Sequence, residues 1–221
     1  GIYNHIGPEV AVASTKAFIS QLAISALFTI FLGRQREMSL TVGKRIGEAL
    51  QELPELARRV LATEPEVIKI AQKYRDMHSL LTLGRKYNAP IATEAAIKFK
   101  ECCYIPTIDL PAGEMKHGTI ALIDANFPSL VIAPEDSVYD KTKSNIEQIK
   151  ARGGPIIAIT TEGNTEISKF TSDVLYIPKT LEMLSPILTV IPIYLLAYHI
   201  ARLRGNDIDK PRNLAKSVTV E

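Results

Sequence analysis

The chain has 221 residues, of which 46% are hydrophobic and 23% are charged, proportions that are ordinary for a globular protein with one main core. Its 26 Lys and Arg residues against 24 Asp and Glu residues leave a formal net charge of +2, which argues against nucleic acid or an anionic membrane as the main partner. Cys102 and Cys103 are adjacent, so they predict neither a disulfide nor a metal site. This cysteine usage fits a reducing cytoplasm.

The first 75 residues are predicted to be helical. Ser14 or Thr15 can cap a helix that ends near Gly33. Further helices are expected over residues 40–53, over 55–62 after Pro54, and over 64–74. Because this part holds no clear strand pattern, it cannot form an α/β domain by itself.

Strand and helix patterns alternate after His78. Short apolar runs predict strands over 79–83, 130–133, 156–160 and 174–177. Helices are expected between and after them, over 90–104, 138–152, 165–170 and 181–204. This alternation is typical of a parallel sheet covered by helices on both faces. We therefore predict an α/β three-layer sandwich, preceded by a helical segment.

Two apolar runs, 17–33 and 186–203, are of borderline length for crossing a bilayer. Polar residues recur through both runs, and Pro192 lies inside the second. We therefore expect buried core helices and no membrane partner.

The helix predicted over 90–104 carries Glu94, Lys98 and Glu101 on the side opposite its apolar residues. By itself this pattern is typical of a solvated face with an ion pair. Two features favour a functional site instead. The helix follows the carboxyl end of a strand, where ligands bind in parallel sheets. The next segment, 110–118, is an irregular loop with glycine and proline that carries His117, and such loops position catalytic groups.

The last twelve residues alternate Leu214, Val218 and Val220 with polar groups. Because disordered tails are normally poor in aliphatic residues, we expect this tail to dock onto the body of the protein. Docking would bring Lys216 into partly dry surroundings, which favour a neutral amine that can attack a carbonyl. On spacing alone, a solvated charge is the commoner explanation of a lysine near a C-terminus.

Five phrases carry a resemblance to a known family: G-P-E-V-A-V-A-S-T-K-A-F, A-A-I-K-F-K-E, A-G-E-M-K-H-G, S-N-I-E-Q-I-K-A-R-G-G and P-R-N-L-A-K-S-V-T-V-E. In order and spacing they resemble the C-terminal part of the glutamine–fructose-6-phosphate aminotransferases, also called glucosamine-6-phosphate synthases. The resemblance runs from residue 7 to the last residue. It implies a sugar isomerase (SIS) fold and the conversion of fructose 6-phosphate and ammonia to glucosamine 6-phosphate.

The resemblance also implies roles for four residues. Lys216 matches the lysine that forms a Schiff base with the C2 carbonyl of the sugar. Glu101 matches the carboxylate that moves a proton between C1 and C2, and Lys98 matches a lysine beside it. His117 matches the histidine of sugar-ring opening, which in the family arrives from the neighbouring subunit, so the resemblance implies a homodimer.

Val12 and Ala215 match positions at which the backbone of the family approaches the sugar. The resemblance implies no cofactor and no metal. It also implies that a glutaminase domain and most of a first SIS module are missing from this chain, so we expect an isomerase fragment. Residues 1–75 would be the trailing part of the first module with a linker, 76–205 the second module, and 206–221 a catalytic tail.

Two other functions stay open at this point. A non-catalytic SIS module that senses sugar phosphates would have no use for Lys216. A related deglycase or ketosamine isomerase could share the fold, Glu101 and His117. The phrase P-R-N-L-A-K-S-V-T-V-E favours the aminotransferase.

Overall fold

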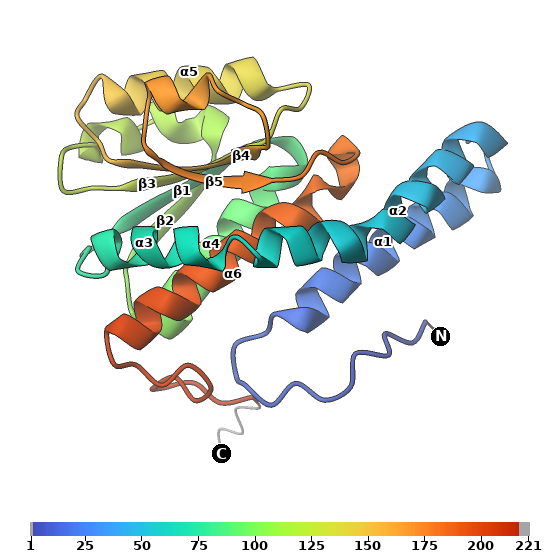
Figure 1. Cartoon of the computed structure of the whole chain (residues 1–221), viewed down its shortest axis with the longest axis horizontal. Coiled ribbons are helices and arrows are strands. Elements are labelled where there is room, and N and C mark those ends of the chain that lie inside the picture. Colours follow the sequence, from blue (N-terminus) through green and yellow to red (C-terminus); the bar gives the residue numbers. More distant parts are fainter. Residues whose placement is uncertain (1, 217–221) are drawn as a thin grey trace.

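The structure, a computed structural model, describes residues 2–216 and has one parallel β-sheet between two layers of helices (Figure 1). The strands are β1 (Leu80–Gly84), β2 (Thr107–Pro111), β3 (Ser129–Ala133), β4 (Ile156–Thr161) and β5 (Asp173–Ile177). The α-helices are α1 (Lys16–Arg34), α2 (Leu40–Leu61), α3 (Glu64–Tyr74), α4 (Ala89–Cys103), α5 (Tyr139–Lys150) and α6 (Ser185–Leu203). The predicted α/β class and three-layer arrangement are confirmed.

The strands lie in the order β2-β1-β3-β4-β5, and all neighbouring strands are parallel. β1, β3 and β4 are buried along their whole length, because they lie inside the sheet and helices cover both faces. Alternate residues point to opposite faces. Leu80 and Leu130 pack in the core with α3, α4 and α6, whereas Leu81 and Val131 pack in the core with α5.

Helix α4, which carries the predicted site, is held between the sheet and α6. Pro90 lies in its first turn, where a missing backbone N–H does no harm. The helix ends at Cys103 and is capped by Tyr104, which has a left-handed φ of 55° and donates its backbone N–H to the carbonyl of Phe99. Burial of Ala92, Ala95 and Phe99 fixes α4 against its neighbours.

Strand β2 is absent from the predicted elements, because residues 105–109 hold no apolar run that predicts a strand and 110–118 is predicted to be a loop. The strand pairs with β1 at the edge of the sheet. Its sequence, T-I-D-L-P, places Asp109 in the middle and Pro111 at the end. Edge strands are often short and polar in this way, so an apolar run could not reveal it.

The helices predicted over 40–53 and 55–62 are one continuous helix, α2, with Pro54 inside it. Proline removes one backbone hydrogen bond and usually interrupts a helix. Here the buried side chains of Ile46 and Val60 lie on either side of Pro54. We infer that burial of this common apolar face outweighs the loss of one hydrogen bond.

The helix predicted over 165–170 is only a short 3-10 helix, Ile167–Lys169. The side chain of Asn164 accepts hydrogen bonds from the backbone N–H groups of Glu166 and Ile167, which stabilises a turn in place of a longer helix. The helix predicted over 181–204 is present as α6, which follows a short 3-10 helix.

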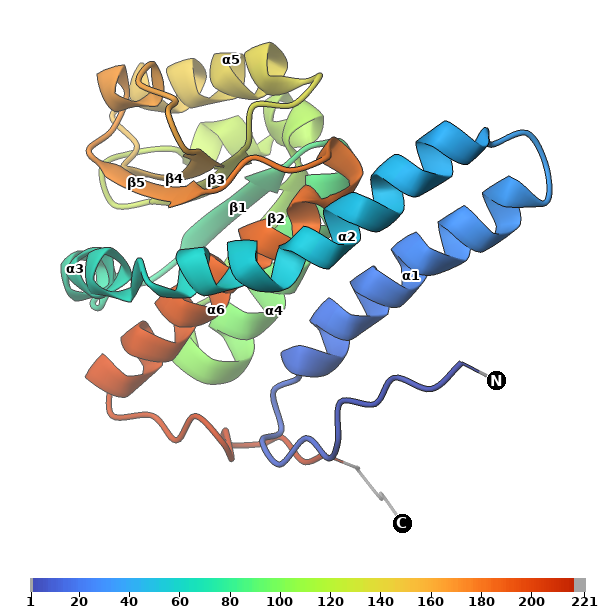
Figure 2. The same ribbon diagram turned by 45° about the vertical axis from the view of Figure 1, so that its right-hand side comes forward.

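Both apolar runs form helices that are long and apolar enough to cross a membrane, α1 and a segment that includes α6. In α6 the prediction of a core helix is confirmed, because 72% of its most apolar window is buried. In α1 the prediction is wrong, because only 6% of the corresponding window is buried. α1 and α2 form a hairpin at the side of the sheet (Figure 2), and no described residue covers the outer face of α1.

The N-terminal segment before α1 and the segment after α6 lie side by side (Figures 1 and 2). The backbone N–H of Val12 donates to the carbonyl of Asp209, 2.9 Å away. The tail also docks at Arg212, whose backbone N–H donates to the hydroxyl of Tyr104 at 2.8 Å. Leu214 remains 42% exposed, whereas Ile208 packs against the core and Pro211 is buried, so polar contacts and some apolar burial hold the described part of the tail. Val218 and Val220 lie outside the described residues.

Candidate active site

Three charged side chains on α4 form an ion-pair cluster that we call the α4 triad: Glu94, Lys98 and Glu101. The Nζ atom of Lys98 lies 2.8 Å from Oε2 of Glu101 and 3.6 Å from Oε1 of Glu94. The side chains of Lys98 and Glu94 are only 4% and 9% exposed, whereas Glu101 is 28% exposed. A fully solvated face is therefore the wrong interpretation, because α6 and the N-terminal segment cover this side of α4.

Tyr194 of α6 completes the α4 triad on its buried side. The Tyr194 hydroxyl donates a hydrogen bond of 2.8 Å to Oε1 of Glu94. Burial raises the pKa of Glu94, and the Lys98 ammonium and the Tyr194 hydroxyl offset only part of this rise. Burial and the Glu94 carboxylate also raise the pKa of Tyr194 well above its usual range, so its hydroxyl stays protonated and remains a donor.

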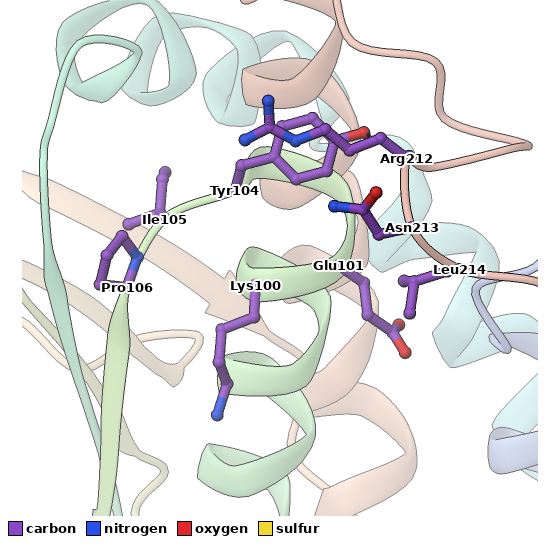
Figure 3. Close-up of a pocket in the computed structure, with 8 residues that line it drawn as sticks. All are labelled: Lys100, Glu101, Tyr104, Ile105, Pro106, Arg212, Asn213 and Leu214. Atoms are coloured by element: carbon purple, nitrogen blue, oxygen red, sulfur yellow. Dashed lines mark hydrogen bonds between the residues drawn. The ribbon is translucent and has the colours of Figure 1, made fainter.

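The carboxylate of Glu101 is the member of the triad that a ligand can reach. Glu101 lines a hollow of about 430 Å³ together with the end of α4 and the tail. Figure 3 shows that its carboxylate points to the side on which Leu214 lies, while Lys100 points to another side of α4. On the same hollow, the Arg212 guanidinium lies 4.2 Å from the centre of the Tyr104 ring. The tail that carries Lys216 thus passes over the Glu101 end of α4.

Lys216 does not lie in dry surroundings, contrary to the sequence-based expectation. Its side chain is 48% exposed. Its Nζ atom donates to Oε2 of Glu9 at 3.2 Å and to the backbone carbonyl of Ala11 at 3.0 Å. The amine is therefore held in an ion pair with Glu9.

Val12 and Ala215 lie at the same junction between the N-terminal segment and the tail. Val12 bonds to the tail through its backbone N–H, and Ala215 directly precedes Lys216. The structure therefore brings together three of the predicted residues: Val12, Ala215 and Lys216.

His117 is separated from these residues within one chain. It follows a 3-10 helix, Ala112–Lys116, which packs in the core with α5 on the opposite face of the sheet from α6. Its side chain is 74% exposed, and its Nε2 atom lies 4.0 Å from a carboxylate oxygen of Glu114. The structure of one chain thus does not bring His117 to Glu101 or Lys216.

Two polar partners of the site were missed by the sequence analysis: Glu9 and Tyr194. The signal for Glu9 is an acidic residue shortly before the first turn of an apolar helix, where the positive end of the helix dipole attracts a carboxylate. Tyr194 is one polar group within a strongly apolar helix. Its partner on α4 is distant in the sequence, so no local pattern connects them.

The residues that the structure describes include no group of three or more His, Cys, Asp or Glu side chains arranged to hold a metal ion. Cys102 and Cys103 are buried and form no disulfide. Burial raises the pKa of Cys103 to about 12, so its thiol is protonated and weakly reactive at neutral pH.

Comparison with known proteins places the chain among its relatives. The glutamine–fructose-6-phosphate aminotransferase (isomerizing) of Thermus thermophilus is 49% identical over 221 residues, which are 100% of this chain and 37% of that protein. The C-terminal domain of glucosamine-fructose-6-phosphate aminotransferase from Francisella tularensis has a TM-score of 0.87 at 34% identity, over 93% of this chain and 58% of that chain. The chain thus spans little more than a third of the length of its curated relative.

A glucosamine-6-phosphate deaminase from Thermotoga maritima has a TM-score of 0.69 at 20% identity, over 96% of this chain and 59% of that chain, and so shares the fold. The family model of the SIS domain matches residues 73–204, which is more than half of the chain. The chain therefore belongs to the SIS domain family, and its resemblance to the C-terminal part of the glutamine–fructose-6-phosphate aminotransferases is confirmed.

Proposed function

We propose that the chain is the isomerase portion of a glutamine–fructose-6-phosphate aminotransferase and acts on fructose 6-phosphate in the cytoplasm. The observation that carries this proposal is the passage of the Lys216 tail over the Glu101 end of α4. A carbonyl-attacking amine and a proton-transferring carboxylate are the two groups that the reaction requires. The names of the relatives point to the same substrate.

In the proposed reaction, Lys216 first leaves its ion pair with Glu9. The neutral amine attacks the C2 carbonyl of the open-chain sugar, and loss of water gives an imine. Ammonia then replaces the lysine at C2 and releases the amine. This sequence needs no cofactor.

Glu101 carries the proton in the proposed isomerisation. Its carboxylate takes a proton from C1 and returns it to C2, which converts the ketose imine into the amino aldose. The Lys98 ammonium lies 2.8 Å from this carboxylate and holds it in place at the end of α4. Because Glu101 is more exposed than Lys98, the sugar can contact the Glu101 carboxylate while the Lys98 ammonium stays buried on its other side.

The complete reaction from glutamine requires parts that this chain does not contain. His117 would act in ring opening on a neighbouring subunit of a homodimer, since it lies apart from Glu101 within one chain. We assign residues 1–75 to the end of a first SIS module and a linker, 76–205 to the second module and 206–221 to the catalytic tail. A glutaminase domain and the rest of the first module would belong to the remaining length of the relatives, of which this chain matches 37%.

Borohydride reduction in the presence of fructose 6-phosphate tests the proposal, because it converts an imine into a stable amine adduct. We expect an adduct on Lys216 that disappears in Lys216→Arg and persists in the control Lys210→Arg. A chain with no adduct on Lys216 would contradict the proposed function and would favour a sensing module.

A steady-state assay of the isolated chain tests its dependence on the missing parts. With glutamine as the only nitrogen source, we expect no glucosamine 6-phosphate, because no glutaminase releases ammonia. Appreciable turnover with glutamine would overturn the proposal that a separate glutaminase is required.

A further inference from the structure

Glu9 is a largely covered carboxylate beside Lys216, and several hydrogen bonds hold it in place. Its side chain is only 12% exposed. Oε1 accepts hydrogen bonds from the backbone N–H groups of Thr15 at 2.9 Å and Ala17 at 3.1 Å, and Oε2 accepts one from the hydroxyl of Ser14 at 3.0 Å. These donors belong to the N-terminus of α1, whose dipole also favours a negative charge. The carboxylate is therefore fixed by a helix end.

Lys216 is the opposite kind of residue, a long side chain on an irregular tail. Its described contacts are with Oε2 of Glu9 and the carbonyl of Ala11. These contacts place the amine next to Val12, whose backbone bonds to the tail at Asp209. The Lys216 amine is thus bound to the Glu9 carboxylate, which the start of α1 holds in place beside the proposed sugar site.

We propose that Glu9 is a positioning residue for Lys216, whose carboxylate anchors the lysine amine at the Val12 edge of the site until the sugar carbonyl arrives. This role rests on the proposed function of Lys216 as the Schiff-base lysine. Holding a reacting group in place raises its effective concentration at the substrate. Glu9 would therefore increase the rate of imine formation although it stabilises the unreactive ammonium.

Glu9 is not a base in this scheme. Burial alone would raise the pKa of Glu9, but the hydrogen bonds from Thr15, Ala17 and Ser14 outweigh it and lower the pKa to about 2. So weak a base does not take the lysine proton efficiently near neutral pH. The contribution of Glu9 is position and charge.

The substitution Glu9→Gln tests the role of the charge without disrupting the start of α1. The amide oxygen of glutamine can still accept the hydrogen bonds of Thr15 and Ala17, so the helix start is retained, while the negative charge beside Lys216 is lost. Glu52→Gln is a matched control, because Glu52 is exposed on α2, away from the tail. Far-UV circular dichroism verifies that both variants are folded.

Two measurements on Lys216 should change in opposite directions in Glu9→Gln. Labelling by a small amine-acylating reagent without sugar, read by mass spectrometry relative to Lys210, should rise about two- to fivefold at neutral pH, because the ion pair that holds the amine is lost. Borohydride trapping with fructose 6-phosphate should fall by about tenfold, because the more reactive amine is no longer positioned. Glu52→Gln should change neither quantity.

Each alternative has its own outcome. If Glu9→Gln raises both labelling and trapping, Glu9 only restrains the lysine and the positioning role is overturned. If neither changes, the ion pair has no role in the reactivity of Lys216, and the positioning role is likewise overturned. The proposed function still stands in that case if the wild type is trapped at Lys216. Absence of wild-type trapping at Lys216 overturns the proposed function itself, and the positioning role with it.

Discussion

At the scale of single residues, the α4 triad is the most unusual feature of the chain. Transferring Lys98 and Glu94 out of water is costly, and their attraction often does no more than offset this cost. A buried ion pair is therefore weak support for stability and better support for function. The Tyr194 hydroxyl donates a hydrogen bond to Oε1 of Glu94, the same oxygen that lies 3.6 Å from Lys98.

Removal of Lys98 should be strongly destabilising. In Lys98→Met the Glu94 carboxylate stays buried without a cation, and the free energy of unfolding at pH 7.5 should fall by about 3 kcal/mol. Burial already raises the pKa of Glu94 in the native chain, and loss of Lys98 raises it further. The folded state then binds a proton more tightly than the unfolded state, so the deficit should shrink as the pH falls toward 5.

Urea unfolding at pH 7.5 and pH 5 measures this effect. The matched control is Lys100→Met, since Lys100 is 49% exposed on the same helix, and it should change stability by less than about 0.5 kcal/mol. Equal losses for the two variants would contradict the buried triad.

Glu9 should give the chain an acid-dependent component of stability. Its pKa in the folded state, about 2, lies below the ordinary value of 4.5. Its contribution is therefore fully present above pH 4.5 and is lost as the pH falls toward 2. Urea midpoints between pH 5 and 2.5 should fall less steeply in Glu9→Gln than in the wild type, and parallel curves would contradict the hydrogen-bonded state of Glu9.

The residues of the site were predictable only where the sequence itself carries a local pattern. Helical spacing placed Glu94, Lys98 and Glu101 on one face, and the structure agrees. Their burial was not predictable, because the covering residue Tyr194 is 100 positions from Glu94. The ion pair of Lys216 with Glu9 joins residues 207 positions apart, so no sequence window contains both.

At the scale of elements, the buried strands were found because they are continuous apolar runs. β1, β3 and β4 need apolar residues on both faces, which gives a strong signal. The edge strand β2 needs apolar residues at only a few positions, so no apolar run predicts it. Helices were found through their periodicity, but Pro54 wrongly divided α2, because local rules do not include the burial of Ile46 and Val60 against the rest of the protein.

Replacement of Pro54 should test the continuity of α2. Pro54→Ala restores a backbone N–H in the helix interior, and we expect the free energy of unfolding to rise by about 1–2 kcal/mol. Pro65→Ala is the matched control, because Pro65 lies in the first turn of α3, where proline is tolerated. Thermal denaturation should show a higher midpoint for Pro54→Ala only, and a break in α2 at Pro54 would instead give no increase.

At the scale of the whole molecule, the outer face of α1 is the main departure from a closed core. Leu27, Phe28 and Phe31 are 56%, 46% and 59% exposed. Composition alone could not predict this, because the apolar runs of α1 and α6 have nearly the same mean hydropathy, 1.6 and 1.7, and only the fold distinguishes a covered helix from an uncovered one.

This difference predicts unequal effects for one and the same substitution. Phe31→Ala should change the free energy of unfolding by less than about 0.5 kcal/mol. Phe99→Ala, at a fully buried position of α4, should cost about 3–5 kcal/mol. Chemical denaturation of both variants measures the contrast, and a large loss for Phe31→Ala would show that α1 is covered when the chain is alone in solution.

The central claim is that Glu101 and Lys216 act on one bound sugar. Proton exchange at C1 of fructose 6-phosphate in heavy water, followed by NMR, tests it most directly. We expect the chain to incorporate deuterium at C1, and Glu101→Gln to lower this exchange by about a hundredfold or more while trapping at Lys216 persists. Exchange that is unchanged in Glu101→Gln would contradict the account.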